Sequence, residues 1–301
     1  MIPEVKRYAK PFVKWAGGKT QLLGEIEKSL PDNFASIEDV VYVEPFVGGG
    51  AVLFWLLQRY SNISRAIIND INSDLINVYS VVKVSPDKLV RELQQFESAY
   101  IRLGAQERKD YYAEQRSLFN EKSASKEVMA ALFVFLNRTC FNGLYRVNAK
   151  GAFNVPHGKY ANPKICDDRN IWAVSELLQR VEILCGDFSK TLEYASNKSL
   201  FYIDPPYKPL TETSSFTSYA KEGFNDEEQI RLGRFCMEIS KRRAMFVASN
   251  SDPQEMNPQD DFFYRVYDTF NIRKVQASRM INANPSGRGK LFEIMITNID
   301  R

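Results

Sequence analysis

The feature that most constrains the fold of this chain is a series of seven short apolar runs spread along its 301 residues. Most of these runs are continuously apolar rather than alternating, which is typical of strands that are covered on both faces. Helical patterns lie between several of them, for example after the first run and before the fifth. The predicted strands are 40–46, 65–70, 181–187, 199–206, 244–250, 264–270 and 292–298.

This alternation of strands and helices predicts an α/β fold, a Rossmann-like, doubly wound and mostly parallel seven-stranded sheet. Residues 73–166 interrupt the pattern, because they read as helical up to about Leu136 and are then rich in Gly and Asn. The stretch from Arg146 to Val155 predicts a β-hairpin with its turn near Gly151. We therefore expect a catalytic sheet domain with a mostly helical, hairpin-ended insertion, divided as 1–72 and 167–301 against 73–166.

The composition is that of a soluble protein, with 44% apolar and 26% charged residues. The longest apolar run, 128–136, has about nine residues, whereas a membrane-spanning helix needs about 20. The first residues lack the apolar core of a signal peptide, and the scattered cysteines and single histidine give no zinc-binding spacing. These observations predict a cytoplasmic protein with reduced thiols, no membrane partner and no metal.

Basic residues are concentrated in three windows without any acidic residue, namely 5–24, 138–166 and 269–292. The windows together carry a charge of +15, so the rest of the chain must carry −12 to give the net charge of +3. Basic segments on an acidic body indicate one surface that binds a polyanion, if folding brings the windows together. Separate solvated surfaces are the alternative.

A glycine-rich turn, Gly48 to Gly50, separates the first predicted strand from a helical pattern. Such a turn lets a ligand approach the backbone and the free N–H groups at the start of the helix. Asp70 ends the second predicted strand, where a carboxylate can accept hydrogen bonds from the two hydroxyls of a ribose. The turn matches neither GxGxxG nor GxxxxGK[ST], which argues against NAD and ATP and favours another nucleoside-type cofactor.

The sequence DPPY, residues 204–207, lies at the carboxyl end of the strand predicted at 199–206, at the edge of an α/β sheet where ligands bind. The two prolines fix the backbone and remove N–H donors beside Asp204, so that a carbonyl can face a ligand. A carboxylate and a carbonyl that each accept one N–H of an exocyclic amine would free its lone pair for attack. Tyr207 supplies a ring on which a base can stack. The motif therefore indicates methylation of an amino group on a base that has left its duplex.

Several motifs together resemble the Dam family of N6-adenine DNA methyltransferases, which methylate adenine in GATC. The resemblance runs nearly end to end, with the glycine motif first, the insertion second and DPPY third, and the segment 97–127 matches poorly. It implies a class I methyltransferase that uses S-adenosylmethionine, acts as a monomer on double-stranded DNA and lies with the nucleoid. The motifs are FVKWAGGKTQLL, VEPFVGGGAV, INDINSDLINVY, LNRTCFNGLYRVNAKGAFNVPHGKY, GDF, DPPYKPL followed by FTSY, and RGKLFEI.

The resemblance also implies roles for individual residues. The catalytic set is Asp204, Pro205, Pro206 and Tyr207. The donor-binding set is Trp15, Gly17, Gly18, Lys19, Glu44, Phe46, Gly48, Gly50, Asp70, Asp187, Phe188 and Asp204. The DNA-binding set is Lys14, Arg138, Phe141, Asn142, Leu144, Arg146, Asn148, Pro156, Arg288 and Lys290.

Within the DNA-binding set, Lys14 and Arg146 resemble guanine-reading residues, and Arg288 and Lys290 resemble phosphate contacts. Phe141 stands where the family has a tyrosine that wedges into the base stack, and it lacks the hydroxyl. The residues alone leave structural alternatives open, since Asn142 lies in an ordinary Asn-Gly turn and Phe141 and Leu144 could belong to a core.

Two other functions remain open at this stage. The same chemistry could act on an RNA base or on a protein glutamine amide, although an amide needs no base-reading insertion. A DNA-binding regulator without catalysis is the third possibility, against which the intact glycine turn, Asp70 and Asp204 argue. The sequence leaves open whether a cognate restriction endonuclease exists.

Overall fold

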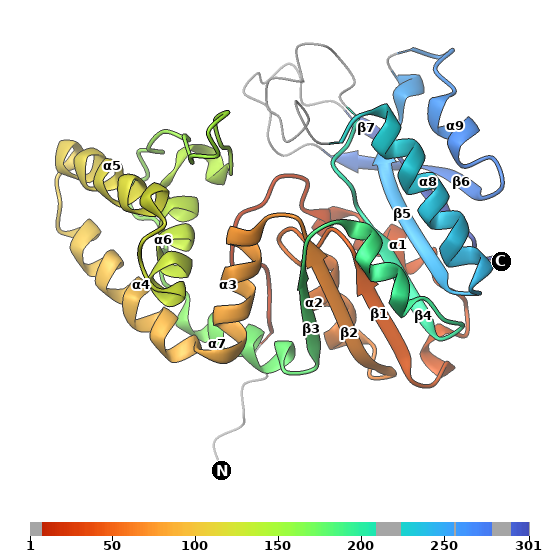
Figure 1. The fold of residues 1–301 in the computed structure, drawn as a ribbon, viewed down its shortest axis with the longest axis horizontal. Helices are drawn as coiled ribbons and strands as arrows, with labels where there is room; N and C mark the ends of the chain where they lie inside the picture. The colour runs from red at the N-terminus through yellow and green to blue at the C-terminus, as the bar shows by residue number, and fades with distance from the viewer. Residues whose placement is uncertain (1–7, 209–223, 256, 279–289, 301) are drawn as a thin grey trace. The chain divides into compact units, whose positions relative to one another are not determined.

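The computed structural model describes residues 8–208, 224–255, 257–278 and 290–300 (Figure 1). The helices are α1 (Leu23–Glu27), α2 (Ala51–Arg59), α3 (Ser73–Val84), α4 (Pro86–Ile101), α5 (Ala105–Glu121), α6 (Lys126–Thr139), α7 (Asp168–Leu178), α8 (Asp226–Lys241) and α9 (Phe262–Val266). The strands are β1 (Val40–Glu44), β2 (Ile63–Asp70), β3 (Val181–Cys185), β4 (Ser199–Ile203), β5 (Met245–Ser251), β6 (Asn271–Ser278) and β7 (Lys290–Thr297).

The strands form one seven-stranded sheet in the order β3-β2-β1-β4-β5-β7-β6. The pairs β1–β2, β1–β4 and β4–β5 are parallel, whereas β7 runs antiparallel to both β5 and β6. This arrangement confirms the predicted α/β, Rossmann-like and mostly parallel sheet. The strand order reverses between β1 and β4, so the carboxyl ends of these two strands mark the edge at which such sheets bind ligands.

One predicted strand is wrong. Residues 264–270 are not extended, because 264–266 belong to helix α9 and 267–270 form a turn, and the strand β6 begins only at Asn271. Phe263 and Tyr267 lie four residues apart, and their rings stack at 6.4 Å, which is the contact that a helix provides. The true strand carries charged residues among apolar ones because it is a sheet edge that pairs with β7 alone.

The chain divides into two compact units, each described here by itself. The first unit comprises 1–18, 48–59 and 70–186, and the second comprises 19–47, 60–69 and 187–301. The expected division into 1–72 with 167–301 against 73–166 concerns function and stays a prediction. The predicted polyanion-binding surface would draw on both units, and it too stays a prediction.

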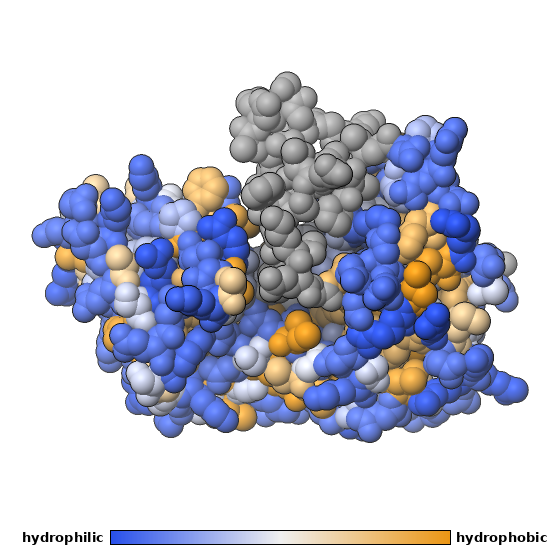
Figure 2. Space-filling view, turned by 45° about the horizontal axis from the view of Figure 1, so that its top comes forward, coloured by the Kyte–Doolittle hydropathy of each residue, from blue (hydrophilic) through white to orange (hydrophobic). Residues whose placement is uncertain are grey.

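In the first unit, helix α6 packs against α3, α4 and α5 (Figure 1). Its residues from Ala130 to Leu136 are all buried, which explains the apolar run seen in the sequence. Ser125 caps the helix by accepting a hydrogen bond from the N–H of Val128. At the left of Figure 2, the surface of this helical segment is mainly hydrophilic, as expected for the outer faces of α4 and α5.

In the second unit, β4 is buried along its whole length, and β1 is buried at four of its five residues. Helix α8 packs against β5 and begins at the predicted cap, where Asn225 accepts a hydrogen bond from the N–H of Glu228. Because the apolar side chains of β1, β4 and β5 fill the core, polar residues at their carboxyl ends are held by a rigid frame.

Candidate active site and nucleic-acid interface

The glycine turn of the first unit is shaped by close packing. Gly48 and Gly50 have φ values of +46° and +72°, a backbone conformation that residues other than glycine rarely adopt. A Cβ added to Gly48 would lie 2.7 Å from Cδ1 of Trp15, and one added to Gly50 would lie 2.5 Å from Oη of Tyr79. The Tyr79 hydroxyl also donates to the carbonyl of Gly48 at 3.0 Å. The glycines are therefore required for the turn itself, and the turn holds Trp15 beside it.

Asp70 is tied to that turn at the end of β2. Its two carboxylate oxygens accept hydrogen bonds from the N–H of Gly48 at 3.1 Å and the N–H of Asn72 at 2.9 Å. Burial raises the pKa of the carboxyl, and the backbone donors oppose that shift. Because a carboxylate offers about four acceptor positions, Asp70 retains capacity for further donors such as hydroxyl groups.

In the second unit, Asp204 directly follows the buried strand β4 and is held by two donors. Nζ of Lys19 lies 3.0 Å from its Oδ1, and the Ser249 hydroxyl donates to the same oxygen at 3.0 Å. The Lys19 side chain is only 7% exposed and that of Asp204 is 19% exposed. Burial raises the pKa of Asp204, and Lys19 opposes that rise by favouring the charged form.

Tyr207 and the prolines before it are fixed by their neighbours in the second unit. The Tyr207 hydroxyl donates to Oε2 of Glu293 at 2.5 Å, and Nζ of Lys19 lies 4.4 Å from the ring centroid. The carbonyl of Pro206 accepts a hydrogen bond from Gln229 at 3.0 Å. The DPPY loop is thus held in place at three points, namely the Pro206 carbonyl, the Tyr207 ring and the Asp204 carboxylate.

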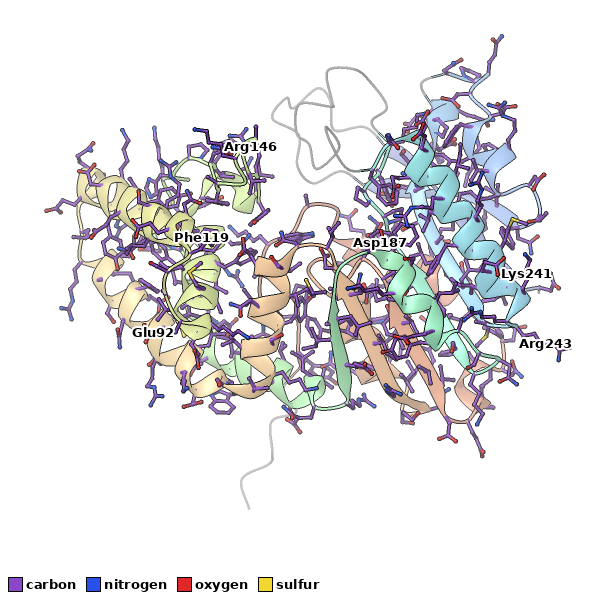
Figure 3. All side chains as sticks on the ribbon, in the orientation of Figure 1. Glu92, Phe119, Arg146, Asp187, Lys241 and Arg243 are labelled. Atoms are coloured by element: carbon purple, nitrogen blue, oxygen red, sulfur yellow. The ribbon has the colours of Figure 1, made fainter. Side chains whose placement is uncertain are left out.

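The GDF segment forms an aromatic and charged cluster in the second unit. The Asp187 carboxylate accepts from Arg231 through both oxygens, at 2.9 and 2.6 Å, and this arginine holds the pKa of Asp187 well below its usual range. The guanidinium lies 4.1 Å from the centroid of the Phe188 ring, which packs against Phe46 at 5.3 Å. Figure 3 labels Asp187 at the start of the short helix η4 (Phe188–Tyr194). The Phe188 ring itself is buried, so this cluster is held together by both charge and aromatic packing.

The predicted hairpin is present in the first unit. Val147 and Phe153 form an antiparallel bridge, and Gly151 lies in the turn with φ of +75°. Oδ1 of Asn148 accepts from two backbone N–H groups of this turn, so the side chain organises the hairpin. Arg146 is exposed and donates from Nε to Oδ1 of Asn154 at 2.7 Å, and Figure 3 shows it in this hairpin. The remaining donors of its guanidinium suit a base edge.

The turn after α6 joins two residues of the DNA-binding set. The N–H of Phe141 donates to the carbonyl of Pro156 at 2.8 Å, and the Phe141 ring is 50% exposed. Asn142 adopts a left-handed conformation with φ of 54°, which Asn tolerates better than most residues. Leu144 is partly buried and contributes to a small apolar hollow with Tyr145. Phe141 is therefore not a core residue.

Lys14 is exposed, but its backbone is clamped by a buried side chain of α6. Asn137 accepts from the N–H of Lys14 at 2.7 Å and donates to the carbonyls of Lys14 at 2.8 Å and of Gly143 at 3.0 Å. A Cβ on Gly143 would lie 2.4 Å from Cδ of Lys14, so the lysine stem lies directly against the turn. The clamp fixes Lys14 to the turn that carries Phe141 and Asn142.

Three further residues of the DNA-binding set have different outcomes. Arg138 is partly buried and donates to the carbonyl of Phe12 at 2.8 Å, so the structure gives it a role in holding the N-terminal segment. Its predicted DNA contact stays untested. Arg288 lies outside the described residues, as does the FTSY segment after DPPY, and Lys290 is described only as the first residue of β7.

In the donor set, Glu44 ends β1, is buried and accepts a hydrogen bond from the Tyr42 hydroxyl at 2.8 Å.

Sequence reasoning missed several residues that hold the site together. Ser249 was detectable as a polar residue at the carboxyl end of a buried strand, and Asn137 as an amide within the apolar pattern of a helix. Glu293 and Arg231 gave no comparable signal, because each contacts a partner more than 40 positions away in the chain.

Within the described residues, no group of three or more His, Cys, Asp and Glu side chains could hold a metal ion. The same residues contain no helix that is long and apolar enough to cross a membrane.

Comparison with known proteins shows similarity along most of the chain. The model of the D12 class N6 adenine-specific DNA methyltransferase family matches residues 15–281. The type II methyltransferase M.MjaIII of Methanocaldococcus jannaschii is 50% identical over 96% of this chain and 99% of the relative. The type II methyltransferase M1.LlaDCHI of Lactococcus lactis is 40% identical over 99% and 98%. The DNA adenine methylase of Escherichia coli K12 is 32% identical over 95% and 94%.

Proposed function

Because this chain belongs to the D12 class N6 adenine-specific DNA methyltransferase family, and is thus an adenine-specific DNA methyltransferase, we propose that its methyl donor is S-adenosylmethionine and its target a flipped adenine in duplex GATC. GATC and base flipping rest on the sequence resemblance and on the chemistry of the described residues. Action as a monomer and a cytoplasmic location stay predictions.

The observation that carries the proposal is the braced carboxylate of Asp204. Its Oδ1 is held by Lys19 and Ser249, so Oδ2 can accept one N–H of the adenine amine. The carbonyl of Pro205 can accept the other N–H, because Gln229 fixes the following peptide through Pro206. With both N–H groups engaged, the nitrogen lone pair is freed for attack, and the carboxylate stabilises the positive charge that develops on the nitrogen. The adenine would stack on the ring of Tyr207, and such stacking contributes about 1–3 kcal/mol to binding of a base.

The residues of the donor set fit a nucleoside. When bound, S-adenosylmethionine supplies a methyl group activated by a positively charged sulfur. In the first unit, the glycine turn leads into the N-terminal end of α2, where N–H groups are free of intrahelical partners, and Asp70 retains acceptor capacity for ribose hydroxyls. In the second unit, Asp187 and Phe188 offer a purine an acceptor and a ring. Further proposed donor contacts are Trp15, Gly17, Gly18, Glu44 and Phe46.

Target reading is assigned to the first unit. We expect Arg146 and Lys14 to donate to the acceptor edges of guanines, where a bidentate arginine contributes about 1–3 kcal/mol of discrimination. The exposed Phe141 ring would fill the stack when the adenine leaves it, and Asn142 would occupy the adenine's former space.

The test is to sequence methylated adenines in DNA from cells that express the chain. We expect N6-methyladenine in GATC, and its absence from DNA of cells that express Asp204→Ala. Another modified motif would overturn the target assignment, and normal methylation by the variant would overturn the mechanism. For base flipping, 2-aminopurine in place of the target adenine should brighten when wild-type protein binds, and unchanged fluorescence would contradict flipping.

A role in a restriction–modification system is favoured by the type II names of two relatives. We include this role in the proposal. A genome in which no endonuclease gene adjoins the coding sequence would contradict it.

A further inference from the structure

Lys19 is assigned to the donor-binding set, but in the second unit its side chain contacts the DPPY motif. It begins the short helix η1 (Lys19–Gln21), and its side chain is 7% exposed. Its Nζ is 3.0 Å from Oδ1 of Asp204 and 4.4 Å from the centroid of the Tyr207 ring. Burying an ammonium group is costly unless it is paired, so its two contacts with the DPPY motif need a reason beyond packing.

The surroundings of Asp204 are rich in negative and ionisable groups. The hydroxyl of Tyr202 lies in the field of Asp204, Glu44 and Glu293, and each of these charges raises its pKa. The groups around Asp204, which act on it directly or on the tyrosines in its field, come from β1, β4, β5, β7, the DPPY loop and η1. They are Tyr42, Glu44, Tyr202, Ser249, Glu293, Tyr207 and Lys19. Without a nearby cation, the pKa of this largely buried carboxyl would rise further, and its affinity for a proton would increase.

A protonated Asp204 could not perform the proposed role. Its oxygen would carry a hydrogen and would no longer accept freely from the amine, and it would no longer offset the positive charge on the attacking nitrogen. Orientation matters as much as charge. Lys19 and Ser249 both contact Oδ1, and two donors on one oxygen restrict rotation of the carboxylate.

We propose that Lys19 is a positioning residue that keeps Asp204 ionised and turned so that Oδ2 faces the substrate amine. The inference deepens the proposed function and rests on it. It replaces a donor-binding role for Lys19 with a role in the reactivity of the carboxylate. Ser249 shares the orienting part of this role and lacks the charge.

The experiment measures the single-turnover rate constant for methylation of duplex DNA between pH 5.5 and 9.5, with saturating S-adenosylmethionine. In Lys19→Met, the apparent pKa on the acid side of the profile should rise by about 1–3 units, because an adjacent cation lowers a carboxyl pKa by that amount. The rate should therefore fall by about tenfold or more at low pH and recover toward wild type at high pH. Lys19→Arg, which keeps the charge, should restore much of the acid-side rate.

Ser249→Ala is the matched control, because it removes the other donor to Oδ1 without changing charge. It should lower the rate at every pH and raise the midpoint less than Lys19→Met does, because it removes a hydrogen bond that favours the charged form but removes no charge. Glu293→Gln keeps an acceptor for the Tyr207 hydroxyl and removes a negative charge, so it should shift the acid-side midpoint to lower pH. This opposite shift tests Asp204 ionisation even if Lys19→Met does not fold, which thermal unfolding would reveal.

Two further results separate the possible failures. Titration with S-adenosylmethionine should give Lys19→Met a Kd within about twofold of wild type, and a large loss of affinity with an unshifted acid limb would restore the donor-binding role and overturn the inference. An acid limb that is equal in wild type and Lys19→Met would also overturn it. If the wild-type protein itself methylates no adenine under any condition, the proposed function fails rather than this inference.

Discussion

The glycine turn of the first unit and the Asp204 loop of the second unit are built on opposite principles. The conformation of the turn depends on steric packing, because two positive φ values and the contacts with Trp15 and Tyr79 determine it. The Asp204 loop depends on charge, because a partly buried carboxylate is held by a buried ammonium among other acidic groups. The comparison teaches that one region should respond to added volume and the other to pH.

The largest expected effect is that of volume at the turn. Gly50→Ala would place a Cβ 2.5 Å from the Tyr79 oxygen in a backbone with φ of +72°. We expect a loss of about 1–3 kcal/mol from backbone strain alone, with further loss from the overlap. The affinity for S-adenosylmethionine should fall at least tenfold at every pH. Chemical denaturation and a donor titration at pH 6 and pH 9 would measure both.

Gly151→Ala is the control for this experiment. Gly151 has nearly the same φ, +75°, but a Cβ there would meet nothing within 4 Å. It should cost only the strain of the left-handed backbone, about 1–2 kcal/mol, and leave donor affinity unchanged. Equal losses of stability in the two variants would mean that packing around Gly50 is not what shapes the turn.

The same contrast explains what the sequence could and could not predict. The sheet class, the hairpin, the cap at Asn225 and the glycine turn follow from local patterns that the structure confirms. The strand placed at 264–270 failed because aromatic residues suit a strand and the packed face of a helix alike. The partners of Asp204 and Tyr207 could not be predicted, since Lys19, Ser249 and Glu293 come from distant segments and no local pattern pairs them.

A smaller effect on stability and specificity is expected at Asn137 of the first unit. Its side chain fixes the local backbone geometry through three hydrogen bonds. Asn137→Asp keeps the acceptor for the N–H of Lys14 but replaces both donor bonds with an oxygen that faces the carbonyls of Lys14 and Gly143. A buried unsatisfied acceptor costs about 1–3 kcal/mol, and the charge of the new carboxylate should raise that cost. Discrimination at the base that Lys14 reads should fall more than activity on GATC. Rate constants on substrates altered at one base pair would show this.

Asn120→Asp gives a matched control. Asn120 makes a similar clamp on the backbone of Phe153, with an acceptor bond of 2.8 Å and a donor bond of 3.1 Å, and it lies on α5 rather than beside Lys14. It should lower stability similarly and leave discrimination at the Lys14 base intact. If both variants relaxed the same base position, the clamp on Lys14 would not be the cause.

The smallest expected effect is on the pH dependence of stability, and it comes from an ion pair in the second unit outside the Asp204 loop. Arg231 lowers the pKa of Asp187 below the ordinary value of 3.8, so the pair stabilises the fold above the unfolded pKa and is lost as pH falls through the folded pKa. The wild-type protein should therefore lose more stability than Arg231→Met between about pH 5 and pH 2. Because the Asp187 side chain is 41% exposed, screening limits this difference to about 0.2–1 kcal/mol.

Urea unfolding at pH 5 and pH 3 would measure the Arg231 effect, with Arg265→Met as control. Arg265 lies in α9 and pairs with Asp261, the residue before that helix, at side-chain exposures of 72% and 57%, so the pair should contribute little at either pH. Arg231→Met should also weaken donor binding severalfold, because Asp187 and the Phe188 ring lose the group that fixes them. If the two variants had the same acid response and the same donor affinity as wild type, Arg231 would be only a surface charge, and the reliance of the second unit on charge would be confined to Asp204.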